Sequence, residues 1–218
     1  MTALLVVAKA PVPGLAKTRL CPPATPEQAA AIAAASLLDT LEAVHATPGA
    51  RPVVALTGEL ERAARAAELR ERLALGTLLD QRGGGFPQRL AAAHADTAAA
   101  HPGLPVLQIG MDTPQVSAEL LAEACRVLTG ADAVFGPAVD GGWWAVGFRD
   151  PRAASLLAAI PTSRPDTGRR TLTALREAGL RVAELPELAD VDTMLDARAV
   201  AAGIPRTRFA AALAGCAR

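Results

Sequence analysis

Hydrophobic residues along this chain fall into short aliphatic runs that alternate with longer, alanine-rich stretches. Runs of this length, bounded by glycine, proline or polar residues, are typical of buried strands, and the alanine-rich stretches have the composition of helices. The pattern predicts strands at 4–8, 53–56, 75–79, 105–110, 132–136, 143–148 and 181–185. It predicts helices at 26–45, 59–73, 87–100, 117–128, 150–159, 167–178 and 193–202.

The order of these elements predicts an α/β fold, a three-layer α/β/α sandwich with a mostly parallel sheet. The segment PAVDGG joins the runs at 132–136 and 143–148 without an intervening helix. Two adjacent strands with a glycine-rich connection predict an antiparallel excursion at the edge of the sheet. At 218 residues, a single domain spanning 1–218 can bury its own core.

The composition restricts the partners and the compartment. Hydrophobic residues make up 51% of the chain but aromatic ones only 3%, so the core must be mostly aliphatic. Lys plus Arg equals Asp plus Glu, at 22 each, so no net charge attracts a nucleic-acid polymer or an anionic membrane surface. Cys21, Cys125 and Cys216 show no C-x-x-C pairing, which fits a cytoplasmic protein without a disulfide framework or zinc site. The apolar run at 3–8 is too short to span a membrane.

The first predicted strand leads into a loop that ends in cationic side chains, LLVVAKAPVPGLAKTRL at 4–20. The loop does not follow the P-loop pattern, because Ala16 stands where that pattern requires glycine and two prolines remove backbone N–H donors. Recognition of phosphate there must use the side chains of Lys9, Lys17 and Arg19, which together suit a polyphosphate. On charge alone, a solvated basic loop explains the same residues.

Acidic residues after later strands suggest a metal site beside this loop. Asp112 directly follows the fourth predicted strand, and Asp192, with Asp190 behind it, follows the last. Magnesium is commonly held by one or two carboxylates together with phosphate oxygens. The alternative is local, because Asp112 can cap a turn and Asp192 can cap the helix that begins after it.

The segment VDGGWW at 139–144 combines an acid, two glycines and two tryptophans. Gly141 and Gly142 allow a ligand or another backbone to approach closely, and Asp140 can act as a general base on an acceptor hydroxyl or bind the acceptor. A tight Asp-Gly hairpin turn accounts for the same residues. In a strand, Trp143 and Trp144 point to opposite faces, so at most one lines the site and the other belongs to the core.

Four segments together resemble one protein family. They are KAPVPGLAKTRL at 9–20, IGMDTP at 109–114, GPAVDGGWWAVG at 136–147 and LPELADVDTMLD at 185–196. They span most of the chain in the order expected of the DUF2064 family of glycosyltransferase-like proteins. The first segment is also similar to the phospholactate guanylyltransferases. The resemblance implies a GT-A (nucleotide-diphospho-sugar transferase) fold and a metal-dependent transferase.

The resemblance also leads to a set of expected site residues. We expect Mg²⁺ or Mn²⁺ on Asp112 and Asp192. Catalytic roles are expected for Lys17, Arg19 and Asp140, and acceptor binding for Gly141, Gly142 and Trp143. Nucleotide binding is expected of Lys9, Pro13, Gly14, Lys17, Arg19, Thr57, Gln81 and Arg89.

Two further segments leave their roles open. QRGGGFPQRL at 81–90 departs from the family pattern, because an acidic residue, Leu-Gly and Glu are replaced by Gly85, Phe86-Pro87 and Gln88. Gln81 and Arg89 are kept, but the contacts to base and ribose stay in doubt. SRPDTGRR at 163–170 is basic, and it is either a solvated loop or a set of arginines that meets an anionic acceptor.

Three functions are open for such a protein. With a nucleotide sugar as donor, an acceptor hydroxyl attacks the anomeric carbon, which is glycosyl transfer. With a nucleoside triphosphate, a phosphorylated small acceptor attacks the α-phosphorus and pyrophosphate leaves, which is nucleotidylyl transfer of the guanylyltransferase type. The basic first loop favours the second chemistry, whereas the other motifs and the length favour the first, which we place first. A non-catalytic nucleotide-binding protein is the third, because the segment 81–90 is altered.

Overall fold

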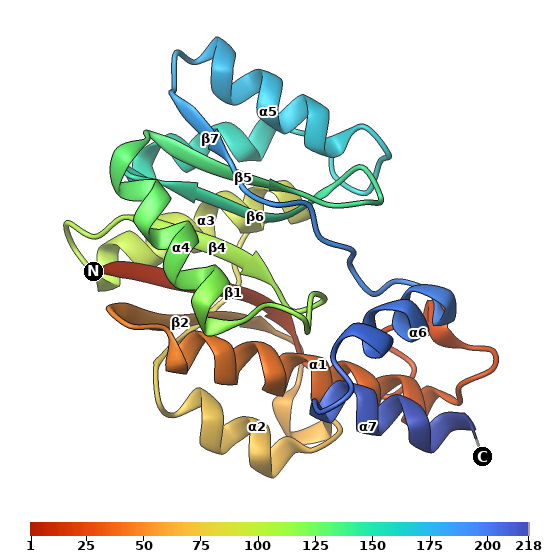
Figure 1. The fold of residues 1–218 in the computed structure, drawn as a ribbon. Coiled ribbons are helices and arrows are strands. Elements are labelled where there is room, and N and C mark those ends of the chain that lie inside the picture. The colour runs from red at the N-terminus through yellow and green to blue at the C-terminus, as the bar shows by residue number, and fades with distance from the viewer. Residues whose placement is uncertain (218) are drawn as a thin grey trace.

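The chain folds around a seven-stranded sheet with helices on both faces (Figure 1). The computed structural model describes residues 1–217. The strands are β1 (Thr2–Lys9), β2 (Ala50–Thr57), β3 (Thr77–Asp80), β4 (Val106–Gly110), β5 (Ala133–Pro137), β6 (Trp143–Phe148) and β7 (Val182–Glu184). They lie in the order β3-β2-β1-β4-β6-β5-β7, and β6 alone runs antiparallel to its neighbours. The predicted mostly parallel sheet is confirmed.

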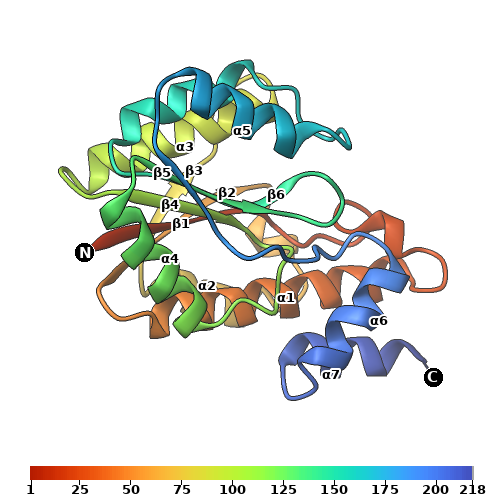
Figure 2. The ribbon, with the colours of Figure 1, turned by 45° about the horizontal axis from the view of Figure 1, so that its top comes forward.

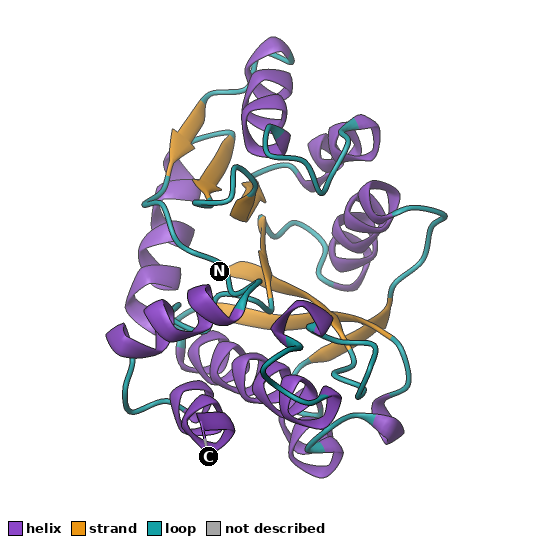
Figure 3. Ribbon diagram, turned by 90° about the vertical axis from the view of Figure 1, so that its right-hand side faces the viewer, coloured by secondary structure: helices purple, strands orange, loops and turns teal. Residues whose placement is uncertain are grey.

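Two helical layers cover the sheet. The α-helices are α1 (Pro26–Ala46), α2 (Ala66–Leu73), α3 (Phe86–Ala100), α4 (Ala118–Gly130), α5 (Thr167–Glu177), α6 (Met194–Gly203) and α7 (Arg208–Ala214). Short 3₁₀ helices are η1 (Thr18–Leu20), η2 (Leu60–Arg62), η3 (Pro151–Ala159) and η4 (Gly215–Ala217). One face packs α1, α2 and α4, and the other packs α3, η3 and α5 (Figure 2). Figure 3 shows the strands between these layers, which confirms the expected three-layer sandwich.

The structure corrects the position of the antiparallel strand. The sequence predicted that the excursion lies at the edge of the sheet, but β6 lies between β4 and β5, and β7 forms the edge beyond β5. The physical reason is burial, because five of the six residues of β6 are buried. A strand with so few exposed positions gains most when it pairs on both sides.

Three helical predictions also change. The stretch 59–73 forms η2 and then α2, so only its second half is α-helical. The stretch 150–159 forms a 3₁₀ helix, in which Pro151 follows the capping residue Asp150. The tail after 204, for which no element was predicted, contains α7, which begins at a Thr207 cap that accepts from the N–H of Ala210.

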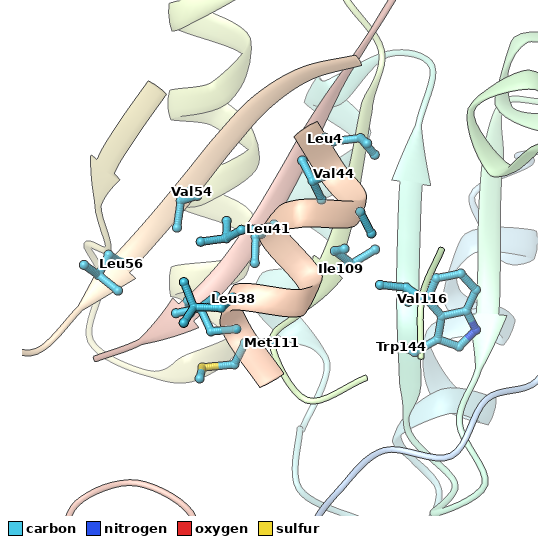
Figure 4. Packing of buried hydrophobic residues seen from close by; sticks show 14 of the residues in the cluster. Leu4, Leu38, Leu41, Val44, Val54, Leu56, Ile109, Met111, Val116 and Trp144 are labelled. Carbon is cyan, nitrogen blue, oxygen red and sulfur yellow. The ribbon is translucent and has the colours of Figure 1, made fainter. Parts of the chain in front are cut away.

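The long helix α1 forms the core of one layer. Its start is the predicted capping box, because the Thr25 side chain accepts from the Gln28 N–H and the Gln28 side chain accepts from the Thr25 N–H. Leu38, Leu41 and Val44 lie on its buried side (Figure 4). Among residues 1–217, this is the one helix that by length and composition could cross a membrane, but 72% of its most apolar window is buried inside the fold.

A smaller hydrophobic cluster joins the C-terminal helices to two loops at the end of the sheet. Its fully or nearly fully buried members include Leu20, Val191 and Phe209. Leu20 directly follows Arg19, and Val191 directly precedes Asp192. The cluster therefore fixes the backbone beside two predicted site residues.

Helix α7 is attached to α1 through a buried carboxylate. Asp39 on α1 accepts from the Phe209 N–H at 2.8 Å and from the guanidinium of Arg208 at 3.1 Å. The Asp39 side chain is 8% exposed. The hydrogen bond from the Phe209 N–H to Asp39 holds the backbone of Phe209. The side chain of Phe209 belongs to the hydrophobic cluster.

The substitution Phe209→Ala should lower the free energy of unfolding by about 3–5 kcal/mol, because it leaves a cavity in this cluster. Urea unfolding measures the loss, and Phe209→Leu serves as a conservative control that should lose clearly less. An unchanged urea midpoint for Phe209→Ala would show that the cluster does not contribute to stability.

Candidate active site

Loops at the carboxyl ends of β1, β2, β3 and β4 surround a cleft of about 820 Å³. Ligands of open α/β sheets bind at this edge, where neighbouring strands end together. The hairpin between β5 and β6, the loop 162–165 and Thr167 at the start of α5 also line the cleft. A smaller cavity of about 250 Å³ adjoins it and shares Lys9, Arg19, Asp112 and Asp192 with it.

Lys17 contacts both of the predicted metal ligands. Its backbone is left-handed, with φ 48° and ψ 41°, a conformation that costs free energy in a residue other than glycine. Its ammonium lies 3.0 Å from Asp112 Oδ1 and 3.1 Å from Asp192 Oδ1, and it also donates to the Val191 carbonyl. Arg19 adds a second cation, 3.0 Å from Asp192 Oδ2.

The charge of Lys17 is stabilised by these carboxylates. The side chain is only 13% exposed. Burial alone would lower the pKa of the ammonium, but Asp112 and Asp192 outweigh this effect and raise the pKa above its ordinary value. Lys17, for which contact with phosphate is expected, lies in the structure between the two predicted metal ligands.

Backbone contacts position the two carboxylates. The Val191 N–H donates to the Asp112 carbonyl at 2.9 Å, which joins the segment before α6 to the end of β4. The N-cap of α6 is Thr193, whose side chain accepts from the Asp196 N–H. Asp192 is therefore not the helix cap that the local alternative proposed, and its carboxylate faces Lys17 and Arg19 instead.

Asp192 also belongs to an acidic cluster. Carboxylate oxygens of Asp140, Asp190 and Asp192 lie within 4.8 Å of one another. Asp140 Oδ1 accepts from the Gly142 N–H at 2.7 Å. Asp140 therefore forms the tight turn of the local alternative and also lies beside the other two carboxylates. Burial, together with the charges of Asp140 and Asp192, raises the pKa of Asp190 to about 6.

The two glycines of the hairpin allow close packing against the loop before α5. Gly141 has φ 86°, and a Cβ on it would lie 2.0 Å from the Pro165 carbonyl oxygen. The Gly168 N–H donates to the Gly141 carbonyl at 2.8 Å. Gly141 therefore holds the hairpin in place through backbone contacts.

Trp143 and Trp144 pack on opposite faces of the sheet, as predicted. Trp143 packs with the cluster on the α3 face, and Trp144 belongs to the cluster on the α1 face. The indole N–H of Trp144 donates to the Pro186 carbonyl at 2.8 Å. Both nevertheless border the cleft, where the sequence predicted at most one.

The residues predicted to bind the nucleotide gather over β1, β2 and β3. Gln81 Nε2 donates to the carbonyls of Ala8 at 2.8 Å and Ala55 at 2.9 Å. Because both bonds use the amide nitrogen, they orient Oε1 as the remaining acceptor. The Arg89 guanidinium lies 5.7 Å from the centre of the Phe86 ring, which combines an apolar surface with a cation at the start of α3.

Most of the expected site residues border the main cleft. They are Lys9, Arg19, Thr57, Gln81, Arg89, Asp112, Asp140, Gly142, Trp143 and Asp192. Lys17 borders the adjoining cavity. Pro13, Gly14 and Gly141 border neither. Pro13 and Gly14 are exposed at the turn of the first loop, where Gly14 has φ 75°.

The structure also separates the three arginines of the basic segment 163–170. Arg169 and Arg170 form ion pairs with Asp166 on the surface of α5. Arg164 borders the cleft, and it has no ion pair with any residue from 1 to 217. Of the three, Arg164 is therefore the one placed to meet an anionic ligand.

Sequence reasoning missed other cleft residues. Phe86, Gln108, Thr162 and Ser163 border the cleft, and none of them was predicted to do so. Only Gln108 carried a signal, because it is the polar residue within the aliphatic run VLQIG. The others belong to loops or helix ends whose position the sequence does not determine.

The fold matches that of nucleotide-diphospho-sugar transferases and nucleotidyltransferases. A family model described as "Uncharacterized protein conserved in bacteria (DUF2064)" matches residues 40–164. The chain belongs to this family, as its motifs predicted. No curated protein matches the sequence.

Three solved structures illustrate the likeness. A protein of Desulfovibrio desulfuricans G20, provisionally described as a nucleotide-diphospho-sugar transferase, is 27% identical with a TM-score of 0.85, over 99% of this chain and 95% of that chain. CMP:2-keto-3-deoxy-manno-octonic acid synthetase in complex with CTP is 11% identical with a TM-score of 0.60, over 94% and 99%. Rv0371C of Mycobacterium tuberculosis H37Rv in complex with manganese is 21% identical with a TM-score of 0.53, over 92% and 98%. The last two show the fold alone.

The substitution Lys17→Met should strengthen Mn²⁺ binding in the absence of nucleotide by about tenfold, because it removes the cation that neutralises Asp112 and Asp192. Calorimetric titration of the free protein with Mn²⁺ measures the change. Lys9→Met is the matched control, because Lys9 Nζ donates to the Leu15 carbonyl. Equal Mn²⁺ affinities of wild type and Lys17→Met would contradict this interpretation.

Asp190 should make the metal-free protein less stable as the pH rises from about 4 to about 6. A carboxyl with a raised pKa in the folded state binds its proton more tightly there than in the unfolded state, and this advantage is lost above that pKa. In EDTA, Asp190→Asn should raise the melting temperature by about 1–3 °C at pH 7.5. The gain should shrink toward pH 4.5, and an equal gain at both pH values would exclude this origin.

Proposed function

We propose that this chain is a metal-dependent transferase that uses a nucleotide-activated donor, and that the donor is a nucleotide sugar. The observation that carries the proposal is the pairing of Lys17 and Arg19 with Asp112 and Asp192 at one end of the cleft. A metal-bound diphosphate needs both signs of charge, cations for the phosphate and carboxylates for the metal. The cleft volume of about 820 Å³ lies in the range of small-molecule sites. The named activities of the structural neighbours support the transferase class.

The residues fit a divalent metal ion. The Lys17 ammonium shows that positive charge is accommodated between Asp112 and Asp192, and oxygens of Asp140 and Asp190 lie close to Asp192. Carboxylate oxygens are the ligands that Mg²⁺ and Mn²⁺ prefer. We propose Asp112 and Asp192 as the ligands, and a bound ion there would neutralise charge on the donor diphosphate.

Glycosyl transfer assigns the remaining roles. The acceptor hydroxyl attacks the anomeric carbon while the bond from that carbon to the β-phosphate oxygen breaks. Asp140 takes the hydroxyl proton, and the nucleoside diphosphate leaves. Lys17 and Arg19 neutralise the negative charge that develops on the departing diphosphate. Gly142 and Trp143 border the cleft beside Asp140, where we propose that the acceptor binds.

Nucleotidylyl transfer is the second candidate, and the basic loop favours it. In this reaction the acceptor phosphate attacks the α-phosphorus and pyrophosphate leaves, so charge develops on phosphoryl oxygens near Lys17 and Arg19. Arg164 has no carboxylate partner among residues 1–217 and borders the same cleft, which suits a phosphorylated acceptor.

A ligand panel tests the proposal. Melting temperatures are measured with nucleoside triphosphates and nucleotide sugars, each with Mg²⁺, Mn²⁺ or EDTA. We expect a rise only with metal and nucleotide together. Release of nucleoside diphosphate from a nucleotide sugar identifies glycosyl transfer, and release of pyrophosphate identifies nucleotidylyl transfer. Binding without either product would leave a non-catalytic nucleotide-binding protein, and the absence of any rise would refute the proposal.

The substitution Asp112→Asn should weaken metal-dependent nucleotide binding by about 100-fold, because it removes one of the two proposed ligands. Calorimetry with Mn²⁺ and the nucleotide found in the panel measures the loss. Glu123→Gln is the control, since Glu123 forms an exposed ion pair with Arg126, and such pairs contribute little. Normal binding by Asp112→Asn would remove this residue from the site.

A further inference from the structure

Strand β4 carries a buried polar side chain, Gln108, in an otherwise apolar run. It is 2% exposed and yet borders the cleft, so it lies at the floor. Its neighbours in register are Leu5 on β1 and Val146 on β6. Both belong to the cluster beneath α3, so the polar group of Gln108 stands against an aliphatic surface.

The fold leaves the carboxamide oxygen of Gln108 without a well-formed hydrogen bond. Its Oε1 is buried and has no hydrogen-bond partner among residues 1–217. The imidazole of His94 is its polar neighbour within the fold, and their weak interaction only partly offsets the effect of burial on the His94 pKa. The same ring packs edge-on against Phe148, with 5.3 Å between ring centres. Burial lowers the pKa of His94 to about 3, so the ring is neutral and brings no charge to the cleft floor.

A buried amide without a partner destabilises a folded chain. The other residues of β4 are aliphatic, apart from the terminal glycine, in the sequence VLQIG. The unpaired carboxamide oxygen therefore lowers the stability of the free protein. A ligand that enters the cleft can reach the carboxamide, because the residue borders that space, and a small rotation of the side chain would then pair its oxygen.

The order of the strands shows which part of a ligand reaches Gln108. The predicted nucleotide contacts Thr57 and Gln81 lie at the ends of β2 and β3, on one side of β1. Gln108 and Trp143 belong to β4 and β6, on the other side of β1. The basic loop after β1 lies between these halves, so a donor whose phosphates meet that loop extends its next group over β4.

We propose that Gln108 binds the group joined to the phosphates of the donor, and that this group is uncharged and bears hydroxyls, as a sugar does. The inference rests on the proposed function. A carboxamide offers both a donor and an acceptor, which is the pairing that hydroxyl groups need. The aliphatic floor and the neutral His94 disfavour a charged group at this depth, and Trp143 supplies an apolar wall.

The stability of the free protein tests whether the carboxamide of Gln108 destabilises the fold. Gln108→Met keeps the length of the side chain and removes its polar atoms, so it should raise the melting temperature. Thr97→Val is the matched control, because Thr97 Oγ1 is also buried without a partner but Thr97 does not border the cleft. A rise for Thr97→Val with a fall for Gln108→Met would show that the fold satisfies the amide, and the proposal would be wrong.

Nucleotide binding tests whether Gln108 contacts the sugar group of the donor. The probes are UDP, GDP, ADP and their glucose conjugates, each titrated calorimetrically with Mn²⁺. For the base that wild type accepts, Gln108→Met should weaken binding of the glucose conjugate about five- to tenfold and leave the diphosphate unchanged. Thr97→Val should change neither.

The outcomes separate this inference from the proposed function. If wild type binds none of these six nucleotides and none of the nucleotides in the ligand panel, the proposed function fails and the inference fails with it. If wild type binds them and Gln108→Met weakens both forms equally or neither form, only the inference about Gln108 is overturned. The inference is overturned as well if wild type binds the conjugate no more tightly than the diphosphate.

Discussion

The ion pairs of Lys17 with Asp112 and Asp192 are the contact on which the site depends. They join three segments that lie far apart in the sequence: the loop after β1, the end of β4 and the stretch before α6. Partly buried charges are costly unless each has a well-placed partner. The three segments must therefore be held accurately, and the left-handed backbone of Lys17 shows that the loop accepts strain to place this ammonium.

Two structural supports provide that accuracy. The hydrophobic cluster around Leu20, Val191 and Phe209 packs directly beside Arg19 and Asp192. The backbone bond from Val191 to Asp112 then links this cluster to the sheet. On the other side of the cleft, the close contact of Gly141 with the loop before α5 fixes the hairpin that carries Asp140.

The charged groups of the site can pair in two ways. With Lys17 between the carboxylates, positive and negative charges within the protein neutralise one another. A phosphate and a metal ion would offer each partner an alternative, the ammonium to the phosphate and the carboxylates to the metal. The chemistry we propose follows from this exchange, because the charges that a diphosphate complex needs are already present and paired.

Much of the fold was predictable because its strands are short aliphatic runs between clear turn residues. The error at β6 arose because periodicity shows that a strand is buried but does not show which neighbours bury it. Helix α7 was missed for a related reason. Pro205 just before it is typical of an irregular tail, and the burial of the helix depends on Asp39 and the cluster with Leu20. Tertiary contacts decided both.

For the site, the sequence by itself determined the residue types and their place at strand ends. Lys17, Arg19, Asp112 and Asp192 follow from strand boundaries and motif order, because the ends of parallel strands meet at one edge. Only the tertiary structure decided how these charges pair, that Asp190 joins Asp140 and Asp192, and that Gln108 reaches the cleft floor. The physical reason is that pairing and burial depend on distances between segments remote in the sequence, and no local pattern encodes such distances.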